Sequence, residues 1–482
     1  MEVFISAVIG DLTNRSLNFI TSKFSKPTPV DVEDRLLRVL LRAQVIVDEA
    51  IGRHITNQAM LLQLSMLRDA MYRGYYKLDS FSYQSHDGDN KDKFARPSSS
   101  LSKVNSLKRL SFSSRNTLVS KQLQEAHDVL RSMILDMEEL TVFLTSYPRM
   151  YRQPYSMHLQ LGNCMFGLQM EAQLVIYFLL RSQSHCTKEL DVLPVVGPSH
   201  VGKSTLIAHI CKDERVHGHF STILFFRIYE FTEDDLATFR KECTIKHQNL
   251  MSDPDGRWLV VIEFIWDLNE DAWNMLYSAS KRCVPTGSKI IVTSKYDKIV
   301  KFGTTQAVTL NYLPHEAYWY FFKTLTFGST DPEMHPKLTH LAMEIAKILK
   351  TAIAANVTAS LLRDNFNTHF WCNVLTFLRR PVHKLRCGED SLKLLNKNIH
   401  AHLRRMVAPS EDIVVKREYQ RFSEEEVPEI RVQDVMYGSV RPDGEFEALA
   451  WRSQIPPYYS YVFVCEIQKV KGTATKRKRR IL

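Results

Sequence analysis

The sequence predicts a multidomain protein of the α and α/β classes. Between residues 155 and 330, five short apolar runs alternate with helical stretches, which is typical of a parallel, doubly wound sheet. The first run ends in Gly-x-x-x-x-Gly-Lys-Ser at Gly197–Ser204, the pattern of a phosphate-binding loop (P-loop). We therefore expect an N-terminal four-helix bundle, a P-loop α/β nucleotide-binding domain with a parallel sheet, a helical segment and a small C-terminal β-rich unit.

Composition excludes several classes of protein. The 482 residues suggest about two to four domains, and 44% hydrophobic with 24% charged residues is typical of a globular protein. No apolar run approaches the roughly 20 residues of a membrane span, and Met1–Phe4 lacks the basic start of a secretory signal. The eight cysteines form no Cys-x-x-Cys pair, so neither a zinc site nor a disulfide framework is indicated. We expect a cytoplasmic location.

The N-terminal 150 residues are predicted to form the helical bundle. One apolar stripe runs along residues 36–50, and another includes Leu62, Met66, Ala70 and Leu78. Residues 1–20 and 119–146 would supply the other two helices. Between them, residues 82–118 are rich in serine, lysine and turn formers, so we expect a disordered insert there.

The P-loop pattern has a direct chemical reason. Gly197 and Gly202 allow the backbone to bend around phosphate oxygens, and the backbone N–H groups at the following helix start then face the anion. Lys203 would reach the outer phosphates, and the Ser204 hydroxyl would hold Mg²⁺. The candidate nucleotide-binding residues of this loop are Gly197, His200, Val201, Gly202, Lys203, Ser204 and Thr205.

A second strand supplies the other candidate metal ligand. Trp258–Glu263 is an apolar run that ends in an acid, as a buried parallel strand would, and Glu263 could hold the same Mg²⁺ as Ser204. The next residue, Phe264, stands where a second carboxylate would help to activate water. We therefore expect nucleotide binding rather than an enzyme, and no catalytic residue is assigned.

The last third of the chain is expected to be helical over 331–415 and β-rich over 416–468. In the β-rich unit, strands at 430–437 and 446–451 would be joined by the turn Arg441–Gly444, with a third strand at 458–465. The tail, residues 469–482, contains the five cations Lys476–Arg480. This tail favours nuclear import or an anionic partner, or is simply solvated.

Six ordered motifs resemble the plant NB-ARC proteins, specifically the coiled-coil class of disease-resistance proteins with an Rx-type N-terminal bundle. They lie at residues 67–81, Phe166–Glu171, Gly197–Thr205, 259–266, 287–295 and 310–322. The resemblance implies ADP or ATP as ligand, Mg²⁺, a role in plant defence signalling and protein partners for the N-terminal bundle. It also implies that Lys295, in the sensor motif, faces the nucleotide. Oligomerisation stays open.

The departures from the family pattern imply an impaired switch. Leu168 and Lys295 replace arginines, and Glu263-Phe264 replaces two aspartates. No Gly-Leu-Pro-Leu motif occurs near Lys350–Ile353, and neither a Met-His-Asp triplet nor leucine-rich repeats are found. The resemblance then implies a truncated helper, adaptor or decoy with impaired hydrolysis.

Two alternatives from other classes are considered. One is a working P-loop ATPase switch, since Lys203 with Mg²⁺ could support slow turnover. The other is a nucleic-acid-binding protein that uses the basic tail. The second is disfavoured because the net charge of +10 includes terminal cations without interleaved aromatic residues.

Overall fold

The computed structural model describes residues 29–53, 55–84, 104–148, 166–181, 189–228, 231–249, 256–265, 267–379, 401–408, 410–421, 427–438, 440–452 and 460–469. These residues fall into two compact units, one within 1–49 and 66–142 and the other within 50–65 and 143–482. None of the described helices combines the length and apolar character needed to cross a membrane. The predicted first helix and the basic tail beyond residue 469 lie outside the described residues.

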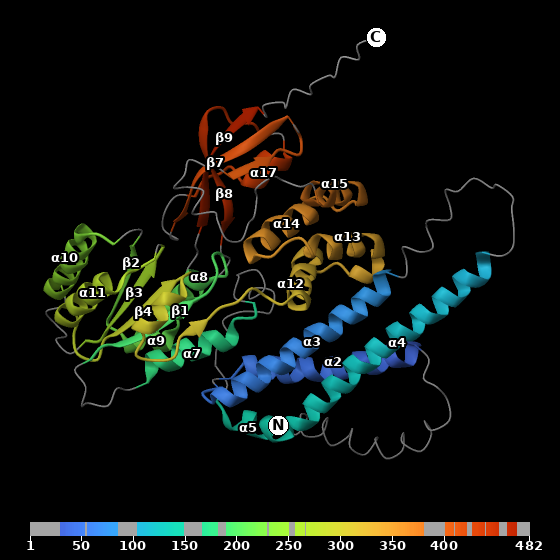
Figure 1. Ribbon diagram of the computed structural model, residues 1–482, viewed down its shortest axis with the longest axis horizontal. Coiled ribbons are helices and arrows are strands. Elements are labelled where there is room, and N and C mark those ends of the chain that lie inside the picture. The colour runs from blue at the N-terminus through green and yellow to red at the C-terminus, as the bar shows by residue number, and fades with distance from the viewer. Residues whose placement is uncertain are drawn as a thin grey trace, which may run out of the picture. The chain divides into compact units, whose positions relative to one another are not determined.

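The first unit consists of long helices that lie side by side (Figure 1). They are α2 (Pro29–Ile51), α3 (Gln58–Gln84) and α4 (Val104–Asp136), and α5 (Glu138–Ser146) follows. The predicted stripe on α2 is confirmed, because Leu36, Leu40 and Ala43 are fully buried. A side chain at Gly74 of α3 would meet Leu40 at 2.8 Å and Leu130 at 3.1 Å, so three helices approach closely there.

Two expectations about these helices are wrong in part. In the predicted stripe on α3, Ala70 and Leu78 are buried, but Leu62 and Met66 are 55% and 51% exposed. Leu67 and Met71 are buried in their place, on the face that approaches Leu40 at Gly74. Helix also covers residues 82–84 and 104–118 of the expected disordered insert. Residues 104–136 contain neither glycine nor proline, so nothing in them interrupts a helix.

The predicted parallel sheet is confirmed. Its strands are β1 (Asp191–Val196), β2 (Thr222–Ile228), β3 (Trp258–Phe264), β4 (Lys289–Ser294) and β5 (Val308–Thr309), in the order β2-β3-β4-β1-β5. The neighbouring strands of this sheet pair in parallel, so their carboxyl ends meet at one edge of the sheet. In sheets of this type, ligands bind at that edge.

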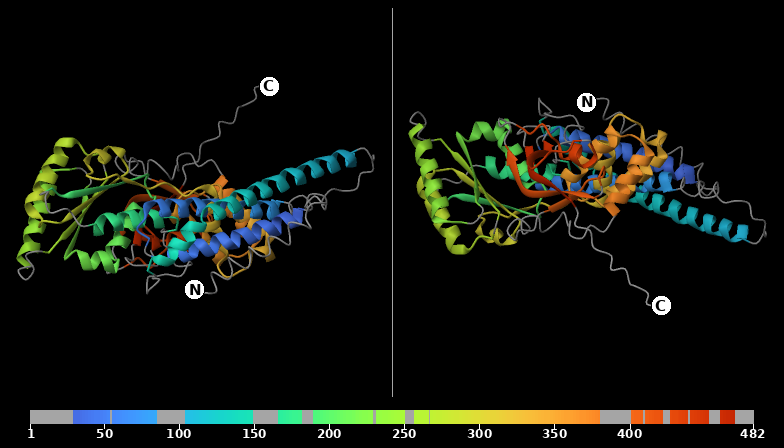
Figure 2. Two further views of the ribbon diagram at one scale, coloured as in Figure 1. Left: turned by 90° about the horizontal axis from the view of Figure 1, so that it is seen from below. Right: turned by 90° about the horizontal axis from the view of Figure 1, so that it is seen from above.

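Helices cover both faces of this sheet (Figure 2). The helices α10 (Glu233–Asn249) and α11 (Glu270–Cys283), with the short 3₁₀ turn Asp297–Phe302, enclose one apolar core. The helices α7 (Gln169–Leu180), α8 (Lys203–Cys211) and α9 (Glu214–His219) enclose the other. Successive strand residues alternate between the two cores, which explains why the strands are apolar throughout.

A helical segment follows the sheet. It contains α12 (His315–Phe327), a 3₁₀ turn (Pro332–Met334), α13 (Pro336–Ala346), α14 (Ala352–Asp364) and α15 (Thr368–Arg379). The prediction of helix up to residue 415 is wrong at its end, because strands begin at Ala401. Thr351 caps α14, and its buried backbone carbonyl accepts a hydrogen bond from the Tyr318 hydroxyl at 3.0 Å. This bond joins α12 to the start of α14.

The C-terminal sheet is antiparallel, in the order β6-β7-β9-β8. Its strands are β6 (Ala401–Arg404), β7 (Glu411–Arg421), β8 (Glu445–Arg452) and β9 (Ser460–Lys469). The expected strand at 430–437 is wrong, because Val432–Tyr437 forms α17. Val432, Val435 and Met436 are buried at helical spacing against the sheet, and the Arg431 N–H donates to the Asp434 carboxylate at 3.1 Å. Six residues are too few for periodicity to distinguish helix from strand.

Candidate functional site

The P-loop lies between β1 and α8, at the carboxyl edge of the parallel sheet. Its backbone needs glycine at both ends, because Gly197 has φ 151° and Gly202 has φ 105°. A Cβ at Gly197 would lie 2.3 Å from the Leu310 carbonyl oxygen, just beyond β5. His200 adopts φ 59° although it carries a side chain. The loop therefore has the left-handed turns that allow backbone N–H groups to face an anion.

Lys203 lies inside this loop as its first helical residue. Its ammonium donates to the carbonyl oxygens of Gly197 at 2.7 Å and Pro198 at 2.8 Å. Burial lowers the pKa of Lys203 to about 8, while Glu263 opposes this shift and Lys295 adds to it. The amine is thus placed where phosphate oxygens could replace two backbone carbonyls as its acceptors.

Ser204 and Glu263 are brought together as predicted. The Ser204 hydroxyl donates to Glu263 Oε1 at 2.5 Å. One carboxylate beside one hydroxyl matches the way Mg²⁺ is held in proteins, where phosphate oxygens and water complete the shell. Among the described residues, no cluster of three or more His, Cys, Asp or Glu could hold a metal ion by itself. The pair therefore fits a cation that arrives with a nucleotide.

The side of Glu263 away from Ser204 contacts Arg227 on β2. Glu263 Oε2 accepts a hydrogen bond from Arg227 Nε at 2.9 Å, and Arg227 Nη2 lies at the same distance. Phe264, the next residue of β3, is 3% exposed and belongs to the core between the sheet and α10 and α11. Among the described residues of this strand end, β3 supplies no second carboxylate beside Glu263.

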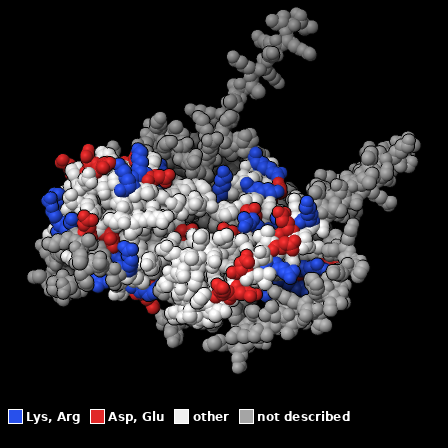
Figure 3. Space-filling model, turned by 60° about the horizontal axis from the view of Figure 1, so that its bottom comes forward, with Lys and Arg blue, Asp and Glu red and all other residues white. Residues whose placement is uncertain are grey.

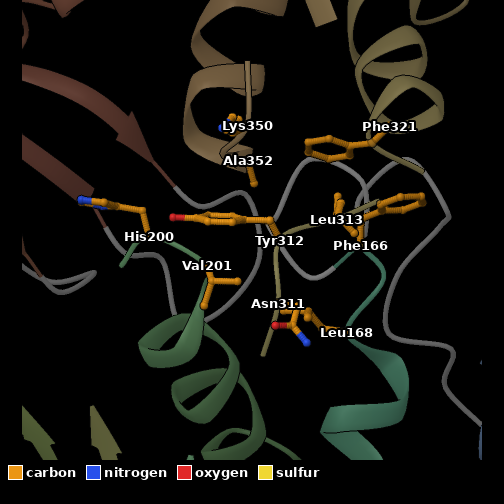
Figure 4. Close-up of a pocket in the computed structure, with 10 residues that line it drawn as sticks. All are labelled: Phe166, Leu168, His200, Val201, Asn311, Tyr312, Leu313, Phe321, Lys350 and Ala352. Carbon is orange, nitrogen blue, oxygen red and sulfur yellow. The ribbon is translucent and has the colours of Figure 1, made fainter. Parts of the chain in front are cut away.

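A shallow pocket with a cavity volume of about 30 Å³, open to solvent, adjoins the P-loop (Figure 4). Tyr312 crosses it, with its ring edge-on and its hydroxyl directed toward His200 in the view. That hydroxyl donates to the Ser199 carbonyl at 2.9 Å and so joins the P-loop to the segment after β5. The pocket is mostly apolar and aromatic, and its lining residues are Phe166, Leu168, His200, Val201, Asn311, Tyr312, Leu313, Phe321, Lys350 and Ala352.

The structure places the remaining candidates in different settings. Val201 and His200 line the pocket, whereas Thr205 is buried in α8. Lys295 follows β4, close enough to Lys203 to lower its pKa. Reasoning from sequence missed Arg227, Phe166 and Tyr312 as parts of the site. A signal existed for Arg227, since it is a charged residue within the apolar run that forms β2.

Comparison with protein families matches residues 175–331 to the NB-ARC domain. This chain carries an NB-ARC domain. NB-ARC domains are nucleotide-binding domains, and the matched residues include the P-loop, Glu263 and Lys295 but neither Phe166 nor Lys350. The resemblance to the NB-ARC domain is thereby confirmed, whereas the coiled-coil class with an Rx-type N-terminal bundle stays a prediction.

The chain is similar to several plant disease-resistance proteins. It is 26% identical over 203 residues to "Disease resistance protein RGA2" of Solanum bulbocastanum, covering 38% of this chain and 20% of that protein. It is 28% identical over 235 residues to "Putative disease resistance protein RGA4" of the same species, covering 43% and 22%. For "Putative disease resistance RPP13-like protein 1" of Arabidopsis thaliana, the identity is 22% over 404 residues, covering 78% and 37%. The matches thus span less than two fifths of each relative's length.

Proposed function

We propose that this chain is an ADP- or ATP-binding regulatory protein of plant defence. The observation that carries the proposal is the P-loop geometry, in which the partly buried Lys203 donates to the loop's carbonyl oxygens and Ser204 contacts Glu263. The similarity to plant disease-resistance proteins supports the defence role. The N-terminal helices would contact protein partners.

In this proposal the nucleotide phosphates occupy the P-loop. Its backbone N–H groups and Lys203 donate to the phosphate oxygens, so Lys203 exchanges its bonds to Gly197 and Pro198 for bonds to phosphate. Ser204 and Glu263 would hold Mg²⁺, which supplies charge neutralisation for the phosphates when bound. Lys295 adds a further cation near Lys203.

The pocket beside the P-loop would take the base and ribose. It opens next to His200 and Val201, and the partly exposed Tyr312 ring could pack against a planar base, while the Phe166 and Phe321 rings are buried and stacked on each other behind it (Figure 4). Lys350 and Ala352 border it from the start of α14, in the stretch where the family's Gly-Leu-Pro-Leu motif is absent. The helical segment would therefore contact the bound nucleoside.

The proposal also states that the chain binds nucleotide but hydrolyses ATP inefficiently. A carboxylate beside Glu263 could orient water, but Phe264 is buried in the core and offers no polar group. The chain would thus act by retaining nucleotide, as a helper, adaptor or decoy, rather than by turnover.

A row of exposed apolar residues on α2 supports the partner-binding role of the N-terminal unit. Leu37, Leu41 and Val45 follow one another at helical spacing and are 44%, 55% and 53% exposed. On the adjacent face of this helix, Leu36 and Leu40 are fully buried. A helix that is apolar on two sides has a second surface for a protein partner.

The test measures ADP binding by calorimetry and ATP turnover by phosphate release on the full-length chain. We expect ADP to bind with a micromolar or lower Kd, at about −8 kcal/mol or better. Turnover should be far below about 1 s⁻¹. Lys203→Ala should lose ADP binding and serves as the background for both assays.

Wild-type turnover at about 1 s⁻¹ or faster would instead identify a working ATPase and contradict the proposed impairment. Phe264→Asp is the complementary variant, and a rise in its hydrolysis would show that only the second carboxylate is missing. Because Phe264 is buried, this variant is interpreted only if it still binds ADP. The wild-type rate decides the question by itself.

A further inference from the structure

Arg227 is the one residue at the carboxyl edge of the described sheet that contacts the candidate metal ligand but belongs to none of the motifs discussed above. The parallel register of β2 and β3 places Arg227 directly opposite Glu263, one residue before both strands end. Both side chains are partly shielded, with 33% and 22% of their surfaces exposed. The pair therefore lies at the edge where the P-loop also opens.

The two oxygens of Glu263 are divided between two donors. Oε1 accepts from the Ser204 hydroxyl, and Oε2 faces the Nε and Nη2 atoms of Arg227, both at 2.9 Å. A guanidinium is always charged and holds a carboxylate with a rigid set of N–H donors. The Arg227 guanidinium, itself a cation, therefore already lies next to the carboxylate with which Glu263 would bind Mg²⁺.

The charges around the phosphate site are unequal. Among the described residues, Lys203, Arg227 and Lys295 carry positive charge, and Glu263 is a carboxylate that faces both Lys203 and Arg227. Asp235 and Glu242 line a separate hollow with Arg227. The neighbouring β3 residue, Phe264, adds no negative charge. An anionic ligand would therefore meet protein cations that can balance its charge, whereas a divalent cation at Glu263 would be repelled by the guanidinium.

We propose that Arg227 acts as a built-in counter-cation at Glu263, so that this chain binds a nucleoside diphosphate with little dependence on Mg²⁺. This inference rests on the proposed nucleotide binding and states how that binding depends on Mg²⁺. Mg²⁺ at Ser204 and Glu263 has to compete with the Arg227 contact, and a diphosphate carries fewer charges to neutralise than a triphosphate. Arg227 is thus a specificity-determining residue that favours the diphosphate when Mg²⁺ is scarce.

The experiment measures the Kd of ADP by calorimetry with millimolar Mg²⁺ and with EDTA, on the full-length chain. For the wild type we expect the two values to differ by less than about threefold, which is well under 1 kcal/mol. For Arg227→Gln we expect ADP to bind at least about tenfold more tightly with Mg²⁺ than with EDTA. Arg227→Lys keeps the charge and should stay close to the wild type.

Arg257→Gln is the matched control. Arg257 precedes β3 at the opposite edge of the sheet, is exposed and contacts the His219 ring at 2.9 Å. Its substitution should leave both Kd values unchanged. Thermal unfolding shows whether Arg227→Gln is folded. If this variant does not fold, the ratio of the wild-type Kd values for ADP with and without Mg²⁺ tests the inference.

The outcomes separate the two proposals. A wild type that binds ADP about tenfold or more tightly with Mg²⁺ than with EDTA overturns this inference and leaves the proposed nucleotide binding intact. An Arg227→Gln variant that is folded and as independent of Mg²⁺ as the wild type also overturns it. A wild type that binds neither ADP nor ATP under either condition overturns the proposed function itself.

Discussion

Gly197 shows how single residues determine the geometry of the P-loop. Its φ is 151°, and a Cβ added there would lie only 2.3 Å from the Leu310 carbonyl oxygen, so there is no room for a side chain. The Leu310 N–H also donates to the Val196 carbonyl at 2.8 Å, so the same contact extends the pairing of β1 with β5. A side chain at Gly197 would therefore distort both the P-loop and the pairing of β1 with β5.

We expect Gly197→Ala to destabilise the NB-ARC domain by about 1–3 kcal/mol and to weaken ADP binding. Gly218→Ala in α9 is the matched control, because no atom lies within 4 Å of the added carbon. That variant should be neutral or more stable by up to about 1 kcal/mol. Urea unfolding and calorimetry check both, and equal effects of the two variants would contradict this account of the loop.

Among single residues, the sequence predicted those site residues that lie close together along the chain. Gly197, Gly202, Lys203 and Ser204 stand at fixed spacing in one loop, so their juxtaposition was expected. The Arg227–Glu263 pair joins two strands, and its existence depends on the register between them, which spacing along the chain does not determine. The role of Tyr312 likewise depends on a segment 113 residues away from its acceptor in the P-loop.

At the scale of elements, Lys289 joins β4 to α7. It is 2% exposed, and its ammonium donates to the carbonyl oxygens of Phe178 and Arg181 at the end of α7, both at 2.6 Å. These are carbonyls that the helix itself leaves without a partner. Burial lowers the pKa of Lys289 to about 8, while Asp191 opposes the shift and Arg181 and Arg257 add to it.

This pKa makes stability depend on pH in a defined direction. Below pH 8 the folded and unfolded states both carry the ammonium, and the cost of burying its charge is fully present. Between about pH 8 and the ordinary pKa of 10.5, the folded state loses the proton and the unfolded state keeps it, so stability rises with pH. Relative to Lys289→Met, the wild type should therefore gain about 1–3 kcal/mol over this range.

Urea unfolding of both proteins at several pH values between 7.5 and 10.5 checks this gain, with Lys298→Met as a control at an exposed lysine. A stability difference between wild type and Lys289→Met that stays constant over the range would show that the amine is not held as the structure indicates.

Elements with long or repeated signals were predicted well, and short ones were not. All five parallel strands were expected because apolar runs recur between helices, and both faces of the sheet are indeed buried. The short α17 was mistaken for a strand, since its helical form depends on packing against the C-terminal sheet. On α3, the prediction was right for Ala70 and Leu78 and wrong for Leu62 and Met66, because spacing alone did not show that Leu67 and Met71 are buried instead.

At the scale of the whole molecule, the chain combines an NB-ARC domain with parts that the family match does not include. The C-terminal sheet lies beyond residue 331, and it has its own buried ion pair, in which Arg405 donates to Glu411 and to the Val435 carbonyl. On the face in Figure 3, Lys and Arg lie in mixed groups with Asp and Glu, and a wide area without charged residues separates these groups. No broad basic face is visible there for nucleic acid.

The central claim is that the P-loop holds a nucleotide, and the nucleotide content of the purified protein tests it most directly. The protein is denatured, and any released nucleotide is identified and quantified by chromatography, with Lys203→Ala as the control. We predict close to one adenine nucleotide per chain, mainly ADP, in the wild type and almost none in Lys203→Ala. A wild type that is empty, and that fails to take up added ADP or ATP, would contradict the claim.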